Sequence, residues 1–300
     1  FTYSVLIRSI TGLIAIYSIA PWKIAFGFSL SAAKELLSFG VPFQLNSFLA
    51  LLKDRLVPLV IAGIVGPTGV GYISQGQRIA FLPLEVMNIM IRLTFPAFSR
   101  LQDNPRELKK TLEEALFFTA LILYPMLFGL VAIAPSFINY VVSPKWQSAL
   151  PLIYLFSVGY FFATLSSPFT NFLNATGRIG TTLKLMIMWT ALEWILSPLL
   201  TLKFGFLGVG IASVLIAPTS LIPFFIIKKT IDVEIIKNIS RPVIAASIMA
   251  VLAYLLSQLF VSNFISLIIV ILISALVYLG LVSVLVKSRV FKYFTNFKNV

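Results

Sequence analysis

The stretch that decides the fold runs from Lys53 to Arg92, with the sequence KDRLVPLVIAGIVGPTGVGYISQGQRIAFLPLEVMNIMIR. Its segments are apolar and long enough to cross a bilayer, yet they contain six charged residues: Lys53, Asp54, Arg55, Arg78, Glu85 and Arg92. A charge at membrane depth costs a few kcal/mol, so it usually faces the interior of a helix bundle or a wet cavity. The stretch therefore predicts membrane helices that line a polar cavity.

Three of these charges follow a regular spacing. Arg78, Glu85 and Arg92 are separated by seven residues at each step. Seven residues are close to two helical turns, which places the three side chains on one stripe at intervals of roughly 10 Å. Two arginines and one glutamate along a membrane helix indicate the wall of a polar cavity.

Composition places the whole chain in a membrane. Hydrophobic residues make up 59% and charged residues 11%, and the mean hydropathy is +1.00, whereas soluble domains carry about 25% charged residues. The chain has neither cysteine nor histidine, which removes disulfides, thiolate or imidazole metal sites and Ser-His or Cys-His nucleophile pairs. We expect no cofactor. The first residue is Phe1, inside an apolar run, so we expect the N-terminal part of a longer protein to be missing.

Hydropathy predicts an all-α, polytopic membrane protein with about nine transmembrane helices. An amphipathic connector covers 21–33, a tight turn covers 66–69, and Asn104-Pro105 begins a helix whose charges pair at i, i+3 and i+4. The helix over 34–65 is predicted to be broken or kinked at Pro42 and Pro58, and the long helix over 70–101 contains Pro83. These three prolines are the hinge candidates. The predicted spans are 1–20, 34–65, 70–101, 115–140, 150–173, 181–202, 208–227, 243–260 and 265–286.

Basic residues predict the orientation, because cytoplasmic loops carry an excess of Lys and Arg. The net charge of +13 is spread between the apolar spans, which favours a bilayer over nucleic acid as the partner. With nine spans, only Lys145 and Lys203 fall on one side, so the other side and the C-terminus are predicted to be cytoplasmic. That side holds Lys23, Lys34, Arg100, Arg106, Lys109, Lys110, Arg178, Lys184, Lys228, Lys229, Lys237, Arg241, Lys287, Arg289, Lys292 and Lys298.

Short motifs in the middle of the chain resemble a known family. Residues 34–42 (KELLSFGVP) resemble the entry to the seventh helix of bacterial polysaccharide transporters. Residues 66–83 match the eighth-helix pattern G-P-x-x-x-G-Y-x-x-x-x-x-R-x-x-x-x-P, and residues 95–103 (FPAFSRLQD) match its end. Lys145-Trp146 with Ala149 and Pro151 resembles the loop before the tenth helix, and residues 175–178 (ATGR) the turn after it.

The resemblance is to the oligosaccharide flippase branch of the multidrug/oligosaccharidyl-lipid/polysaccharide exporter superfamily. It implies a multi-pass protein of the bacterial cytoplasmic membrane that moves undecaprenyl-pyrophosphate-linked sugars for lipopolysaccharide, O-antigen or exopolysaccharide synthesis, with polysaccharide-assembly proteins as further partners. Members have two six-helix lobes. On that template 1–20 is the last helix of a missing N-terminal lobe, 34–229 is the MATE-like C-terminal six-helix lobe, and 230–300 adds two helices and a basic cytoplasmic tail.

An anionic pyrophosphate headgroup suggests which side chains bind it. Arginine grips phosphate oxygens in a bidentate way and stays charged, so Arg78 and Arg92 are the first substrate-binding candidates, followed by Arg55, Lys53 and Arg8. The alternative is that Asp54–Arg78 or Glu85–Arg92 are structural ion pairs. Arg92 also lies near the cytoplasmic end, where it would equally snorkel to the surface.

Transport against a gradient needs a coupling ion. Asp54 and Glu85 are carboxylates that could take up H⁺ or Na⁺, and a permanent salt bridge is the competing interpretation. Glu193, between Trp189 and Trp194, is interpreted as an interfacial or lobe-packing acid.

Two other functions compete with a flippase. A MATE-type drug or cation antiporter would line its cavity with acids and aromatics, which the excess of arginine disfavours. A membrane glycan polymerase or ligase would need acid and base groups at the outer face. The outer loops contain no Asp, Glu or His, so a transporter is preferred over an enzyme.

Overall fold

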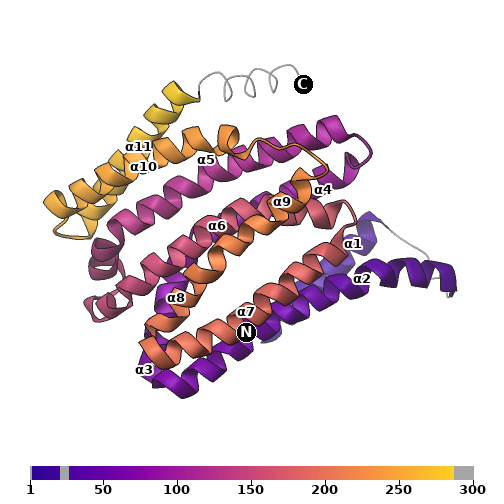
Figure 1. The fold of residues 1–300 in the computed structure, drawn as a ribbon, viewed down its shortest axis with the longest axis horizontal. Coiled ribbons are helices and arrows are strands. Elements are labelled where there is room, and N and C mark those ends of the chain that lie inside the picture. The colour runs from indigo at the N-terminus through magenta and orange to yellow at the C-terminus, as the bar shows by residue number, and fades with distance from the viewer. Residues whose placement is uncertain (1, 21–26, 287–300) are drawn as a thin grey trace. The chain divides into compact units, whose positions relative to one another are not determined.

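The computed structural model describes residues 2–20 and 27–286, apart from the side chains of Thr2, Phe39, Asp54 and Arg55 (Figure 1). All regular secondary structure in these residues is helical. The chain divides into two compact units, Phe1–Val41 and Pro42–Val300. The first holds α1 (Thr2–Ile19) and the start of α2 (Leu30–Leu51). The first part of the predicted connector, 21–26, and the basic tail after 286 lie outside the described residues.

The second unit contains the rest of α2 and all later helices. Each predicted span from 115 onward corresponds to a helix or a pair of helices with bounds close to those expected. The elements in order are η1 (Leu52–Leu56), α3 (Val57–Phe81), α4 (Leu84–Arg100), α5 (Pro105–Phe137), η2 (Ile138–Val142), η3 (Pro144–Ala149), α6 (Leu150–Ala175), α7 (Ile179–Phe204), α8 (Leu207–Ile216), η4 (Ala217–Leu221), α9 (Ile222–Lys228), α10 (Ile235–Phe260) and α11 (Phe264–Leu285).

Seven helices of the described residues are long and apolar enough to cross a membrane, and α1 is a shorter apolar helix. The all-α, polytopic fold class is confirmed, and the predicted count of nine is approximate. The counts differ by two because α1 is too short to be counted and because the region 30–101, predicted as two spans, contributes one, α3. The boundary of a six-helix lobe at 34–229 stays a prediction.

The predicted helix over 70–101 is wrong in one respect: it is broken at Leu82–Pro83, between α3 and α4. Proline has no N–H and cannot continue the hydrogen-bond ladder of an α-helix. Short turn bonds replace the ladder here, from Leu82 N to Ile79 O at 3.2 Å and from Val86 N to Pro83 O at 3.3 Å. By contrast α2 continues through Pro42, and Pro58 sits in the first turn of α3. The hinge role of all three prolines stays a prediction.

The predicted turn at 66–69 is present inside α3. Gly66 has φ 67° and ψ −179°, so two helical segments meet there at a non-helical residue. Positive φ favours glycine because it has no Cβ. Gly69 then packs directly on Val65, where an added Cβ would lie 2.6 Å from the Val65 Cβ.

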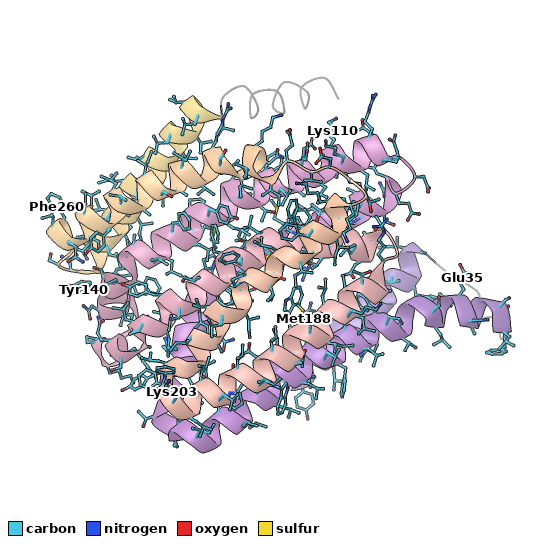
Figure 2. The ribbon with its side chains drawn as sticks, viewed as in Figure 1. Glu35, Lys110, Tyr140, Met188, Lys203 and Phe260 are labelled. Atoms are coloured by element: carbon cyan, nitrogen blue, oxygen red, sulfur yellow. The ribbon has the colours of Figure 1, made fainter. Side chains whose placement is uncertain are left out.

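The charged segment before the fourth span is the first part of α5. Asn104 caps this helix by accepting a hydrogen bond from the Glu107 backbone N–H at 3.3 Å. Lys109 pairs with Glu113 at 3.9 Å and Lys110 with Glu107 at 3.6 Å, as the spacing predicts. Lys110 lies at one end of the bundle and Tyr140 and Lys203 at the other (Figure 2).

The C-terminal helices pack on α5 rather than on the other end of the unit, as Figure 1 shows. Ser136 and Ser257 share a hydrogen bond of 2.8 Å between α5 and α10, and the Tyr278 hydroxyl of α11 donates to Leu121 O at 2.6 Å. Such bonds between helices are typical of membrane bundles. Helix α5 in turn packs on one side of α6. The other side of α6 lines cavities together with α3, α7 and α8.

Candidate functional site

One cavity of about 640 Å³ lies within the second unit and is lined by three of the charged candidates, Lys53, Arg78 and Glu85. We call it the charged cavity. It is formed by η1, α3, α4, α6, α7 and α8, and its lining mixes ionisable and amide groups with apolar ones. The polar lining residues are Lys53, Ser74, Gln77, Arg78, Glu85, Tyr160, Glu193 and Ser213.

The turn at Gly66 brings Lys53 and Arg78 to this cavity. In one straight helix the 25 residues between them would span about 37 Å, yet both side chains line the same hollow. The chain must therefore reverse direction between them, and Gly66 is where its backbone leaves the helical region. The side chains of Lys53 and Arg78, both predicted to bind the substrate, therefore line one cavity because the backbone turns at Gly66.

Arg78 and Glu85 line the charged cavity from opposite sides of the break at Pro83. They do not lie on one uninterrupted helical stripe, which corrects the sequence-based interpretation. Among the described residues, neither side chain forms an ion pair.

Arg92 is exposed on α4 and lines neither the charged cavity nor the second polar cavity described below. The described side chains show no Glu85–Arg92 ion pair. Arg92 thus differs from Arg78, although the sequence ranks the two together. The side chains of Asp54 and Arg55 lie outside the described residues, and Arg8 lies on α1 in the first unit. Their predicted roles stay predictions.

Glu193 is the charged cavity residue that the sequence-based interpretation missed. It projects from the middle of α7 into the charged cavity, and the Ser197 hydroxyl donates to its Oε1 at 2.7 Å. Its neighbours Trp189 and Trp194 suggested a membrane interface. The signal that would have found it is that a carboxylate in the middle of a span usually faces a cavity.

A second cavity of about 430 Å³ adjoins the first, and Lys53, Tyr160, Glu193 and Ser213 line both. We call it the hydroxyl cavity, because its other polar groups are hydroxyls. Its lining residues outside the shared set are Met87, Ile91, Gly159, Ala163, Ser166, Ser167, Thr170, Met186, Trp189, Ile216, Ala217 and Ser220. Most of the lining residues of α6, α7, α8 and η4 lie in the part of each element that is nearer the basic loops at 178–184 and 228–241.

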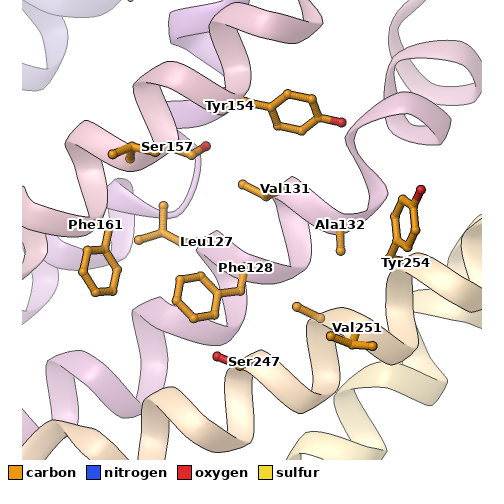
Figure 3. A pocket seen from close by; sticks show the side chains of 12 residues that line it. Leu127, Phe128, Val131, Ala132, Tyr154, Ser157, Phe161, Ser247, Val251 and Tyr254 are labelled. Atoms are coloured by element: carbon orange, nitrogen blue, oxygen red, sulfur yellow. The ribbon is translucent and has the colours of Figure 1, made fainter. Parts of the chain in front are cut away.

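A third hollow, of about 750 Å³, lies between α5, α6 and α10 and is almost wholly apolar. We call it the apolar groove. Figure 3 shows Phe128, Phe161 and Val251 around it, with the rings of Tyr154 and Tyr254 to one side. It holds no charged residue. Across the described part of the chain, no three His, Cys, Asp or Glu side chains are grouped to hold a metal ion.

Seven described helices of spanning length around a charged internal cavity define a multi-pass membrane protein. Residues 1–151 match the family described as "Polysaccharide biosynthesis protein". The chain belongs to this family, which confirms the resemblance seen in the sequence motifs.

Two curated relatives carry names of the same kind. The lipopolysaccharide biosynthesis protein WzxC of Escherichia coli K12 is 29% identical over 166 residues, 55% of this chain and 34% of the relative. The teichuronic acid biosynthesis protein TuaB of Bacillus subtilis 168 is 29% identical over 178 residues, 58% of this chain and 36% of the relative. The matches thus cover about a third of the length of these curated relatives.

A solved structure shares the fold. The lipid II flippase MurJ in an inward closed conformation is similar with a TM-score of 0.69 and 20% identity, over 95% of this chain and 61% of that one. The similarity supports the helical, MATE-like architecture predicted from the motifs.

Proposed function

We propose that this chain is part of a flippase that moves undecaprenyl-pyrophosphate-linked oligosaccharide or polysaccharide repeat units across the bacterial cytoplasmic membrane. The observation that carries the proposal is Arg78, a permanently charged guanidinium that lines a cavity inside membrane-spanning helices. Membership of a polysaccharide biosynthesis family supports the lipid-linked saccharide as the cargo. No covalent step is required.

The charged cavity supports a simple binding scheme. The Arg78 guanidinium donates two parallel hydrogen bonds to phosphate oxygens, and the Lys53 ammonium adds a second positive charge. Glu85 and Glu193 face the same space. Carboxylates there weaken the hold on an anion, which allows release after the cargo has crossed. Protonation of Glu85 or Asp54, or Na⁺ binding, would couple that release to an ion gradient.

The proposal includes an orientation and partners. The basic loops place the C-terminus in the cytoplasm, and the first lobe of the flippase fold and polysaccharide-assembly proteins complete the system. A reporter that is active only in the cytoplasm, fused after Val300, should be active. A reporter inserted at Lys145 should be silent, and the reverse pattern would invert the topology.

The test is genetic complementation with the complete gene. In a flippase-deficient strain, Arg78→Ala should lose surface polysaccharide and Arg78→Lys should restore part of it, since an ammonium keeps the charge but loses the bidentate fork. Arg92→Ala is the matched control and should retain activity, because Arg92 lies outside both cavities. Full activity of Arg78→Ala in correctly inserted protein would overturn the role of Arg78.

A drug or cation antiporter is the second candidate, and Glu85 and Glu193 in the charged cavity favour it. The two functions make opposite predictions for carboxylate variants. Glu193→Gln should abolish efflux of a cationic dye by an antiporter. A flippase should show no dye efflux before or after the substitution.

A further inference from the structure

The hydroxyl cavity has a composition that phosphate binding does not explain. Three serines and one threonine lie in its lining beyond the Ser213 that both cavities share: Ser166, Ser167, Thr170 and Ser220. Its two charged residues, Lys53 and Glu193, both belong also to the charged cavity. Away from that shared boundary, the lining consists of hydroxyls, the ring of Trp189 and apolar residues from glycine to methionine.

One hydroxyl of this lining, that of Ser166, forms no hydrogen bond within the described structure. Its residue is 5% exposed, and its hydroxyl is buried without a hydrogen-bond partner in the described structure. Leaving a buried donor and acceptor unsatisfied costs about 1–3 kcal/mol. Most buried polar side-chain atoms have partners, so an unused hydroxyl on a cavity wall points to a ligand or ordered water.

Trp189 provides a fixed aromatic surface in the same cavity. Its indole N–H donates to Thr219 Oγ1 at 3.0 Å, and the Thr219 hydroxyl donates to Ile216 O at 2.6 Å. The ring also packs on the core cluster of Phe172, Leu173 and Leu185. The indole N–H is thus already used within the protein, and Trp189 lines the cavity as an aromatic residue.

We propose that the hydroxyl cavity binds an uncharged sugar unit of the lipid-linked cargo while the pyrophosphate occupies the charged cavity. Hydroxyl side chains donate and accept, which matches sugar hydroxyls, and an aromatic ring covers the apolar C–H face of a sugar. The volume of about 430 Å³ is within the usual range of small-ligand pockets. This inference rests on the proposed flippase function.

Helix packing alone does not account for the arrangement. Polar side chains in membrane helices commonly bond to a neighbouring helix, as Asn171 of α6 does with Thr94 of α4 at 2.6 Å. Thr170 bonds to its own helix, at 3.0 Å from Ser167 O. Ser166 does neither. The close approach of Ser213 to Gly159, where a Cβ would lie 2.3 Å from the Ser213 Oγ, places another hydroxyl on the same wall.

The test compares two ligands on the purified full-length protein. One is the lipid-linked saccharide isolated from a flippase-deficient strain of the source organism, and the other is undecaprenyl pyrophosphate without sugar. Ligand-dependent thermal stabilisation gives an affinity for each. We expect the wild-type protein to bind the sugar-bearing lipid more tightly. Ser166→Ala should reduce that preference by about three- to tenfold, as expected for one lost hydrogen bond.

Two further variants keep the result interpretable. Ala163→Leu should fill the hydroxyl cavity and abolish the preference, while binding of the bare lipid persists. Ser157→Ala is the matched control, because Ser157 is an equally buried serine of α6 without a hydrogen-bond partner, but it lines the apolar groove. It should leave the preference unchanged.

The outcomes separate the two proposals. Equal binding of both lipids by the wild-type protein, or an intact preference in Ala163→Leu, would overturn the sugar site while leaving the flippase standing. Absence of binding to either lipid would overturn the proposed function itself.

Discussion

The two faces of α6 meet different surroundings. Tyr154, Ser157, Val158 and Phe161 face the apolar groove with α5 and α10. Phe156, Tyr160, Ala163, Ser167 and Thr170 face the two polar cavities with α3, α4, α7 and α8. Each set recurs at intervals of three and four residues, so each is a regular helical stripe. The stripes are about 150° apart around the helix axis.

The spacing of residues along α6 predicts which side chains share a stripe, but it does not predict which helices lie opposite that stripe. Ser157 on the first stripe and Ser166, next to the second, are both buried serines with an unused hydroxyl, and both stripes carry aromatic rings. The two stripes differ in the helices that lie opposite them. On one side α10 supplies Ala250, Val251 and Tyr254, whereas on the other α7 and α8 supply Glu193 and Ser213. The chemistry of the facing helices therefore decides which stripe lines a polar site.

The largest expected effect comes from placing the same bulky residue on either face. Ala163→Trp should fill the hydroxyl cavity and abolish transport, whereas Val158→Trp should retain it, because Val158 is 42% exposed and lines the apolar groove. Complementation by each variant in the complete gene, with insertion checked by membrane fractionation, measures the difference. Equal loss in both variants would break the comparison.

A smaller effect is expected where α3 packs on α6. A Cβ at Gly76 would lie 2.7 Å from the Leu152 Cβ, whereas one at Gly71 would make ordinary contacts of 3.5 Å with Trp146. Gly76→Ala should lower the unfolding free energy by about 1–3 kcal/mol through overpacking. Gly71→Ala should be near neutral. Thermal unfolding in detergent compares the pair, and similar melting temperatures would contradict the close packing.

The groove side should tolerate the loss of one polar contact. Ser257→Ala removes the 2.8 Å hydrogen bond between α10 and Ser136 of α5. We expect a loss of about 0.5–1.5 kcal/mol in stability with transport retained, since neither residue lines a polar cavity. Loss of transport without loss of stability would show that the groove side takes part in function.

The smallest effect concerns the start of α10, outside the membrane. A hydrogen bond of 2.7 Å from Lys237 lowers the pKa of Glu234. A carboxyl whose folded-state pKa is lowered adds stability above its unfolded pKa and loses it as the pH falls through the folded pKa. The stability of the protein should therefore decline slightly in acid, and Glu234→Gln should remove that part of the decline. An unchanged acid limb in the variant would contradict the assignment.

The sequence predicts the spans because about 20 apolar residues are needed to cross a bilayer. It also predicts the turn at Gly66 and the cap at Asn104, because these signals are local. The break at Pro83 was not predicted: Pro83 was a hinge candidate within one long helix, and the seven-residue spacing of Arg78, Glu85 and Arg92 assumes that this helix is continuous.

The candidate site was only partly predictable, because its members are far apart in the sequence. Lys53, Arg78 and Glu85 were found as charges in apolar segments, and all three line the charged cavity. The hydroxyl cavity was not predicted, because serines in membrane helices ordinarily bond to their neighbours. Nothing near Ser166 in the sequence indicates that α7 and η4 supply Trp189 and Ser220 opposite it.

The π-helical segment η1, Leu52–Leu56, has a consequence for the length of the chain. A π-turn closes its hydrogen bond one residue later than an α-turn, so it stores one additional residue within the helix. Deleting a single residue here should leave a continuous α-helix but turn Lys53 by about 100° relative to α3. Homologous chains that differ by one residue at this position can thus share the same helices while presenting a different side chain to the cavity.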